Sequence, residues 1–230
     1  MVTCAPNTPT IEFSATEISM IAILGGTFNP IHLGHLYLAA QLQEKCNFDS
    51  IRFMPAALPA LKDTPSVTAE QRAEMVDIAI SDHPYFAVDT RELSRPGTSY
   101  TIDTLVLLRE ELGNQVSLCW LMGSDAFAHL NAWHRWQELL NYAHLIVVKR
   151  PNNTDLSDLN PEVQNLLNQH AAQSIEEIRQ QAYGKILVQE IAALDISSTD
   201  IREKIRNKKD VGNMIPTGVL IYIQQHKLYQ

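Results

Sequence analysis

Short apolar runs alternate with helical patterns along this chain, and this alternation restricts the fold more than any other feature of the sequence. Six runs rich in apolar and β-branched residues predict strands, at 21–26, 50–56, 86–93, 116–123, 144–150 and 185–191. Between most of them lie apolar stripes at helical spacing, such as Leu36, Ala39 and Ala40 after the first run. Strands that alternate with helices build a mainly parallel sheet covered on both faces. The sequence therefore predicts an α/β fold with a doubly wound parallel sheet.

The domain organisation is expected to be simple. Residues 1–19 are polar and lack the basic start and apolar centre of a secretory signal, so we expect a disordered lead-in followed by one domain, 20–230. Met20 stands directly before the first strand, which leaves a start of translation at that residue open. Residues 151–169 begin with turn formers and then become helical, which predicts an insertion between two strands, and 217–229 predicts a closing helix.

Charge and cysteine content exclude several classes of protein. The formal net charge is −8, which argues against a protein that coats nucleic acid, because such binding needs a basic surface. No apolar run approaches the roughly 18 residues of a membrane span. Cys4, Cys46 and Cys119 show no CxxC spacing, so free thiols in a reducing, cytoplasmic location are expected. The sequence leaves a homo-oligomer open.

The stretch GGTFNPIHLGH, residues 25–35, carries the first motif with chemical meaning. Gly25 and Gly26 end a strand where another group can approach the backbone closely. His32 and His35 are three residues apart at an expected helix start, which places both imidazoles on one face beside the positive end of the helix. Such a start binds phosphate. A histidine pair can also bind a metal ion, but no third ligand stands nearby, so no metal site is predicted.

The stretch ISSTDIR, residues 196–202, is the second motif. Ser197 and Asp200 have the spacing of a capping box, so a helix is expected to begin there. Taken alone, the motif indicates only a well-capped helix. With Arg202 one turn further in, the hydroxyl groups and helix N–H groups of the same stretch could also hold a polyphosphate.

Together the two motifs resemble those of the nucleotidyltransferase superfamily of Rossmann-like adenylyl- and cytidylyltransferases. Within it, GGTFNPIHLGH is similar to the form found in bacterial nicotinate-nucleotide adenylyltransferases, with Asn29 where that family usually has Asp. The resemblance extends from about residue 20 to the end of the chain through further matching stretches, at 91–105, 120–127, 131–140, 143–151 and 215–229.

The resemblance implies a reaction and a set of residues for its nucleotide half. ATP and nicotinate mononucleotide would give deamido-NAD and pyrophosphate, with Mg²⁺ accompanying ATP. The catalytic residues would be His32, His35 and Arg202, with His35 as the donor to the α-phosphate. The ATP-binding residues would be Gly25, Gly26, Thr27, Phe28, Gly123, Asp125, Ser198 and Thr199. A phosphate is already a nucleophile, so no general base is required and catalysis would rest on positioning and charge neutralisation.

The resemblance also implies an acceptor site, with two departures from the family pattern. Its residues would be Lys62, Thr101, Ile102, Trp133, His134 and Arg150, with Trp133 stacked on the pyridine ring. Leu61 stands where the family has a histidine, and His134 stands where it often has another aromatic residue. An adenylyltransferase acting on nicotinamide mononucleotide or phosphopantetheine is the closest alternative. A non-catalytic nucleotide-binding regulator is an alternative from another class.

Overall fold

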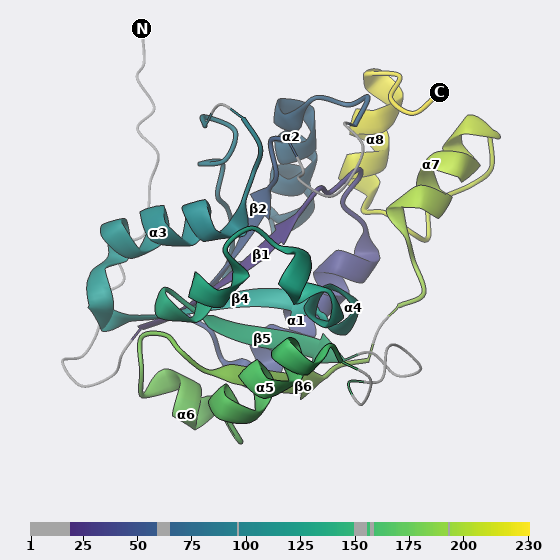
Figure 1. Ribbon diagram of the computed structural model, residues 1–230. Coiled ribbons are helices and arrows are strands. Elements are labelled where there is room, and N and C mark those ends of the chain that lie inside the picture. The colour runs from purple at the N-terminus through teal and green to yellow at the C-terminus, as the bar shows by residue number, and fades with distance from the viewer. Residues whose placement is uncertain (1–18, 59–64, 96, 150–155, 157–158, 193) are drawn as a thin grey trace, which may run out of the picture.

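A six-stranded parallel sheet forms the centre of the computed structural model, which describes residues 19–58, 65–95, 97–149, 156, 159–192 and 194–230 (Figure 1). The strand order is β3-β2-β1-β4-β5-β6, and all neighbouring strands run parallel. The strands are β1 (Ser19–Gly26), β2 (Ser50–Pro55), β3 (Phe86–Val88), β4 (Val116–Gly123), β5 (His144–Lys149) and β6 (Ile186–Glu190). This confirms the predicted α/β class and doubly wound sheet. The order reverses between β1 and β4, where folds of this kind bind ligands at the carboxyl ends of the strands.

Two strand boundaries differ from the predicted ones for local reasons. Ser19, placed in the lead-in, begins β1, where it pairs with Val116 and its hydroxyl donates to Asp49 at 3.2 Å. The third strand ends at Val88 instead of residue 93. There the carboxylate of Asp89 accepts from the Arg91 N–H at 3.1 Å, an Asx turn that takes the chain out of the sheet.

Helices cover both faces of the sheet, and alternate residues of β1 show why. Ala22 and Leu24 point into one core, and Ile21 and Ile23 into the other. The first core lies under α1 (Leu33–Cys46), α2 (Ala69–Ile80), α7 (Ser198–Arg206) and α8 (Thr217–Gln225). The second lies under α3 (Thr101–Leu112) and α5 (Pro161–His170). Two short helices, α4 (Ser124–Ala128) and α6 (Ile175–Arg179), complete the set that Figure 1 labels.

The insertion and the closing helix lie where they are predicted. α5 lies between β5 and β6, with the side chain of Asn160 accepting from the Glu162 N–H at 2.9 Å at its start. α8 packs against α2, and the chain then turns back so that Leu228 and Tyr229 are buried. Within the described residues, no helix is long and apolar enough to cross a membrane.

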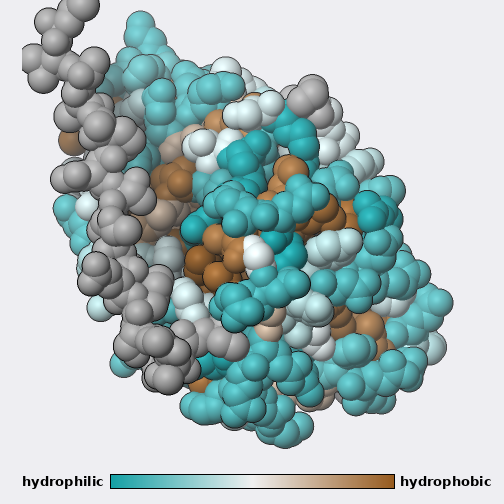
Figure 2. Space-filling view, turned by 90° about the vertical axis from the view of Figure 1, so that its left-hand side faces the viewer, coloured by the Kyte–Doolittle hydropathy of each residue, from teal (hydrophilic) through white to brown (hydrophobic). Residues whose placement is uncertain are grey.

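The surface on the α3 side is hydrophilic over most of its area, with a small group of apolar side chains near its middle (Figure 2). The large apolar side chains that are exposed in the described residues come from separate elements, among them Leu107 on α3, Tyr183 before β6 and Ile221 on α8. Single exposed apolar side chains are ordinary on folded proteins, so this face by itself indicates no partner.

Candidate active site

The turn between β1 and α1 places the two histidines of the first motif side by side. His32 is the residue before the first turn of α1, and His35 lies within that turn. Their rings are stacked, with centroids 3.7 Å apart and planes inclined by 27°. His32 is buried and His35 is half-buried. The structure thus brings both imidazoles to one face of the helix start, as their spacing predicts.

His35 is oriented by the backbone and by an aromatic neighbour. Its Nδ1 accepts a hydrogen bond from the His32 N–H at 3.3 Å, and its ring meets Phe28 edge-on with centroids 5.1 Å apart. Because Nδ1 of the neutral ring is the acceptor, the ring proton lies on Nε2. His35 is therefore held as a donor through Nε2, which is the form that a phosphate oxygen requires.

Three glycines of this turn make room for rings. An added Cβ would lie 2.6 Å from the ring of Trp120 at Gly25 and 2.9 Å from the ring of Phe28 at Gly26. At Gly34 it would lie 2.9 Å from Nδ1 of His32, so this glycine lets that imidazole pack over the helix start. Phe28 itself has a φ of 47°, in the left-handed region that non-glycine residues seldom adopt.

Two backbone donors of the α1 start are already in use, and that of His35 bonds to the His32 carbonyl at 2.9 Å. The Leu33 N–H donates to the carbonyl of Met214 at 2.9 Å. A helix start binds phosphate through N–H groups without a partner, and those of Leu33 and His35 are already bonded. For Leu33 the cause is the segment between α7 and α8, which packs against the start of α1. The histidine side chains therefore supply more of the anion-binding capacity of this turn than the sequence alone indicates.

The second motif forms the start of α7 and bonds directly to the first. The Ser198 hydroxyl donates to the carbonyl of Pro30 at 2.9 Å, and Arg202 Nη1 donates to the carbonyl of Asn29 at 2.8 Å. Arg202 Nη2 also donates to Thr199 Oγ1 at 3.3 Å. A guanidinium has five N–H donors. One donor of Arg202 joins the two motifs, a second bonds within α7, and the others remain for a ligand.

Only one of the two hydrogen bonds of the predicted capping box forms at the start of α7. The Ser197 side chain accepts from the Asp200 N–H at 3.1 Å, which confirms the predicted helix start. The carboxylate of Asp200 pairs with Lys204 Nζ at 2.9 Å, one turn further along the helix. The predicted capping box is therefore half formed, because the ion pair with Lys204 holds its acidic member.

Two residues that sequence reasoning missed hold the first motif in place. The Tyr229 hydroxyl donates to the Asn29 side chain at 2.7 Å, and burial raises the pKa of this phenol, which keeps it protonated. The buried Arg72 donates to the carbonyls of Thr27 at 2.6 Å and Ala56 at 2.7 Å. A sequence signal existed for Arg72, because it interrupts the apolar face of α2.

The end of β4 adds a third segment to the carboxyl edge of the sheet. β4 ends at Gly123 beside β1, and α4 begins at Ser124. Asp125 is exposed, and an added Cβ at Gly123 would collide with its carboxylate. Ser124 Oγ is buried and has no hydrogen-bond partner among the residues that the structure describes. The predicted positions Gly123 and Asp125 thus lie at the strand end that borders the histidine turn.

The two segments predicted to bind the acceptor contact each other. The Tyr100 ring, just before α3, lies 4.5 Å from the His134 ring between centroids. Arg135 Nη1 lies 3.7 Å from the carboxylate of Asp103, in the first turn of α3. The structure therefore brings Thr101 and Ile102, at the start of α3, close to the segment that carries half-buried Trp133 and exposed His134. Lys62 and Arg150 lie outside the described residues.

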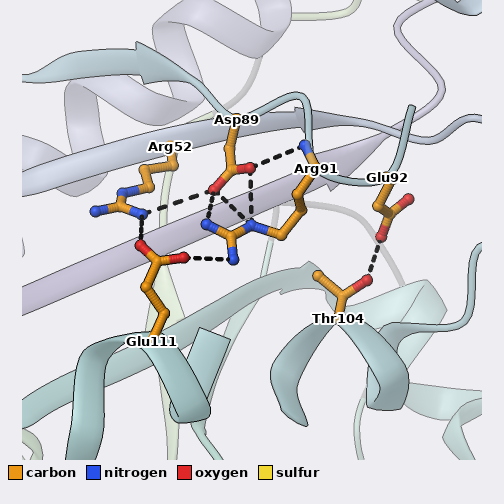
Figure 3. A network of polar contacts seen from close by, with 6 residues as sticks. All are labelled: Arg52, Asp89, Arg91, Glu92, Thr104 and Glu111. Carbon is orange, nitrogen blue, oxygen red and sulfur yellow. Dashed lines mark hydrogen bonds and ion pairs between the residues drawn. The ribbon is translucent and has the colours of Figure 1, made fainter. Parts of the chain in front are cut away.

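A charged network fixes α3 to the sheet at the helix's far end (Figure 3). Asp89, after β3, accepts from Arg91 Nε at 2.8 Å and lies 3.6 Å from Arg52 Nη1 of β2. Glu111, near the C-terminal end of α3, pairs with Arg91 at 2.9 Å. Exposed ion pairs contribute little singly, whereas a network with partly buried members can contribute more. This network fixes the position of α3 relative to β2 and β3.

A buried hydrogen bond fixes the other end of α3. Thr104 Oγ1 donates to Glu92 Oε1 at 2.7 Å, and both residues are buried (Figure 3). Thr104 follows Thr101 and Ile102 by one turn, so this bond positions the turn that carries their N–H groups. The sequence does not indicate this pair, because Glu92 and Thr104 are twelve positions apart and do not lie on the same helix or strand.

We expect Thr104→Val to destabilise the protein, because it removes the hydroxyl that bonds the buried Glu92 carboxylate and keeps the side-chain shape. Losing one such bond costs about 1–3 kcal/mol, with more for a charged group. For a chain of this size each kcal/mol lowers Tm by roughly 2–4 °C. Thermal melts of the parent, Thr104→Val and Thr104→Ser measure the effect. A lower Tm for the serine variant with an unchanged Tm for the valine variant would show that packing of the methyl group, not the hydrogen bond, matters.

No group of three or more His, Cys, Asp or Glu side chains that could hold a metal ion occurs among the described residues. Mg²⁺ usually keeps several waters and is held largely by substrate phosphates in nucleotide sites.

The described geometry has the form of a nucleotidyltransferase site, and comparison with known families agrees. The family model described as cytidylyltransferase-like matches residues 23–204. A probable nicotinate-nucleotide adenylyltransferase from Cellvibrio japonicus is 42% identical over 210 residues, covering 91% of this chain and 98% of that protein. One from Marinomonas sp. is 40% identical, covering 93% and 96%. The chain therefore belongs to the cytidylyltransferase-like family, among its nicotinate-nucleotide adenylyltransferases.

Solved structures match the fold at lower sequence identity. The nicotinic acid mononucleotide adenylyltransferase of Plasmodium falciparum, complexed with NaAD, superposes with a TM-score of 0.68 at 18% identity, covering 92% of this chain and 97% of that one. A putative nicotinate-nucleotide adenylyltransferase from Vibrio parahaemolyticus gives a TM-score of 0.59, covering 92% and 95%. At this level of identity the likeness concerns the fold.

Proposed function

We propose that this chain transfers the adenylyl group of ATP to nicotinate mononucleotide, giving deamido-NAD and pyrophosphate in NAD biosynthesis. An oxygen of the mononucleotide 5′-phosphate forms a bond to the α-phosphorus of ATP, and the bond from that phosphorus to the β-phosphate oxygen breaks. The observation that carries the proposal is the bonding of the two motifs to each other. The start of α7 bonds to the turn that carries the stacked His32–His35 pair. The Ser198 hydroxyl donates to the Pro30 carbonyl, and Arg202 donates to the Asn29 carbonyl.

The site performs this reaction by positioning and charge neutralisation. The attacking phosphate is already anionic, so the protein has to bring two negatively charged groups together and stabilise the charge that develops between them. His35 donates through Nε2 to the α-phosphate, and His32 supports that ring by stacking. Arg202, with Ser198 and Thr199 at the α7 start, binds the β- and γ-phosphates that leave as pyrophosphate.

The remaining nucleotide contacts come from the carboxyl edge of the sheet. The backbone of Gly25, Gly26 and Thr27, with Phe28 above it, lines the nucleotide, and Gly123 and Asp125 border it at the end of β4. Mg²⁺, carried on the phosphates of ATP, supplies further neutralisation of their charge when bound.

Two buried free thiols, Cys46 and Cys119, fit the cytoplasmic location that we propose with this function. Burial raises the pKa of the Cys46 thiol to about 11.

The acceptor occupies the space beside the start of α3. Trp133 stacks on the pyridine ring, and the N–H groups of Thr101, Ile102 and His134 bind its carboxylate. The contact between Tyr100 and His134 supports this assignment, because it joins the two segments that supply those groups. Lys62 and Arg150 are proposed as contacts of the acceptor phosphate.

The assay that tests the function measures pyrophosphate release from ATP with each of three acceptors: nicotinate mononucleotide, nicotinamide mononucleotide and phosphopantetheine. We expect release with the first, together with deamido-NAD as the other product. Release with phosphopantetheine alone would move the chain to another branch of the family. Binding of ATP without release for any acceptor would support the non-catalytic alternative.

Replacing Arg202 by alanine tests the assignment of the two subsites. We expect the KM for ATP to rise by at least about tenfold, because one charge-assisted contact is lost, and we expect turnover to slow. The KM for the mononucleotide should stay within about threefold. Arg202→Lys is the matched control, because it keeps the charge and loses the paired bonds to Asn29 and Thr199. Intact ATP affinity with lost acceptor affinity, measured by calorimetry, would reverse the assignment.

A further inference from the structure

A pocket rich in positive charge lies between α7 and the last residues of the chain. Its volume is about 300 Å³, and its lining includes Ser66, Arg202, Arg206, Lys227 and Tyr229. Three of the lining side chains are cations, and none of the described residues contributes an acidic side chain to the lining. The lining side chains therefore carry an excess of positive charge. Such an excess is local, because the whole chain carries a formal net charge of −8.

The ion pairs of the described residues leave the cations of the pocket without a carboxylate partner. Arg202 and Arg206 are one turn apart on α7 and therefore share a face of the helix. Lys204, on the same helix, is paired with Asp200 at 2.9 Å. By contrast, no carboxylate of the described residues forms an ion pair with Arg206 or Lys227. A concave site with unpaired cations attracts anions more strongly than a flat surface does.

The pocket borders the proposed catalytic turn. Two of its lining residues bond to the same residue of that turn, because Arg202 donates to the Asn29 carbonyl and Tyr229 donates to the Asn29 side chain. Figure 1 shows α7 and the residues that follow α8, which supply most of the lining, on the same side of the molecule. Lys227 and Tyr229 have φ values of 51° and 64°, which non-glycine residues adopt only where the surrounding structure holds them. The chain end is thus folded into a defined wall of the pocket.

We propose that this pocket is a binding site for an oligophosphate anion of the pyrophosphate class, with Arg206 and Lys227 as its ligands beyond Arg202. Guanidinium groups bind phosphate oxygens in pairs, and an ammonium adds a compact charge with three donors. A dianionic or trianionic ligand matches the excess positive charge, whereas a monoanion would leave part of it unmatched. The inference rests on the proposed function for its choice of pyrophosphate, which is the second product of that reaction.

The phosphate groups that occupy the pocket can belong to bound ATP, as its terminal phosphates, or to a free oligophosphate. In the first case Arg206 and Lys227 extend the ATP site past Arg202. In the second the pocket is occupied independently of ATP. Binding of pyrophosphate in the presence of a saturating ATP analogue with a non-hydrolysable α,β linkage separates them. Loss of pyrophosphate binding identifies the ATP phosphates as the source, and retained binding identifies a separate anion site.

The decisive experiment measures pyrophosphate binding to the full chain by calorimetry without ATP, in the parent and in Arg206→Gln/Lys227→Gln. We expect Kd to rise at least about tenfold in the double variant, and the salt dependence of binding to become shallower. Lys208→Gln/Lys209→Gln is the control, because it removes the same charge just after α7 and outside the lining, and its Kd should stay within about twofold. Equal Kd values in the parent and the double variant would overturn the proposal. Because this readout needs no turnover, it is independent of the adenylyltransfer assay.

Discussion

Replacing His35 by alanine is expected to lower kcat by about 10²–10³-fold, the loss typical of one donor that stabilises charge in the transition state. The structure gives the physical reason. The His32 N–H occupies Nδ1 of this ring, so Nε2 carries the proton that a phosphate oxygen accepts. As the donor is fixed before the substrate arrives, it stabilises developing charge without reorganisation at the moment of reaction. Steady-state kinetics with ATP and nicotinate mononucleotide measure the effect.

Two further measurements test whether the lower kcat comes from the loss of the hydrogen-bond donor and not from a loss of stability. His35→Gln places an amide N–H near the position of Nε2 and should recover part of the lost rate, because it restores a neutral donor. Melting curves show whether the alanine variant loses stability through the stacked contact with His32 and the edge contact with Phe28. A folded alanine variant that turns over within about threefold of the parent would show that His35 has no catalytic role.

The sheet and the helices that cover it could be predicted because the pattern that indicates each element lies within a short stretch of sequence. Each strand was visible as a short apolar run, and the helices between them as stripes, so the parallel sheet followed from their alternation. The third strand was predicted to run to residue 93, although the residues after Val88 are mostly polar and the strand ends at Val88. What ends it is a side chain, Asp89, that bonds the backbone two residues on.

The site was predictable where its parts are contiguous motifs and unpredictable where they are contacts between distant residues. The histidine pair and the start of α7 each lie within a short stretch, whereas the bonds from Ser198 and Arg202 that join them link residues far apart in the chain. Tyr229 and Asn29 are two hundred positions apart along the chain. No spacing links them, nor Glu92 with Thr104, since only the packed structure brings their side chains together.

The start of α3 suggests a strong preference between the two pyridine mononucleotides. Tyr100 is the residue before the helix, so the N–H groups of Thr101 and Ile102 belong to its first turn, where backbone donors lack partners within the helix. This end of a helix also carries partial positive charge. The segment with His134 lies against it through the Tyr100 ring. In the acceptor site that we propose, the ring substituent would therefore meet several donors together with a positive field.

Nicotinate mononucleotide is expected to be preferred over nicotinamide mononucleotide by at least about two orders of magnitude in kcat/KM. A carboxylate accepts from every donor at this position, with charge-assisted strength. A carboxamide must turn its NH₂ group toward one of them, which leaves two buried donors facing each other at about 1–3 kcal/mol for each unpaired group. Parallel progress curves with the two mononucleotides at saturating ATP measure the ratio. Comparable kcat/KM values would contradict this arrangement of donors and would assign the chain to adenylyltransferases that accept both substrates.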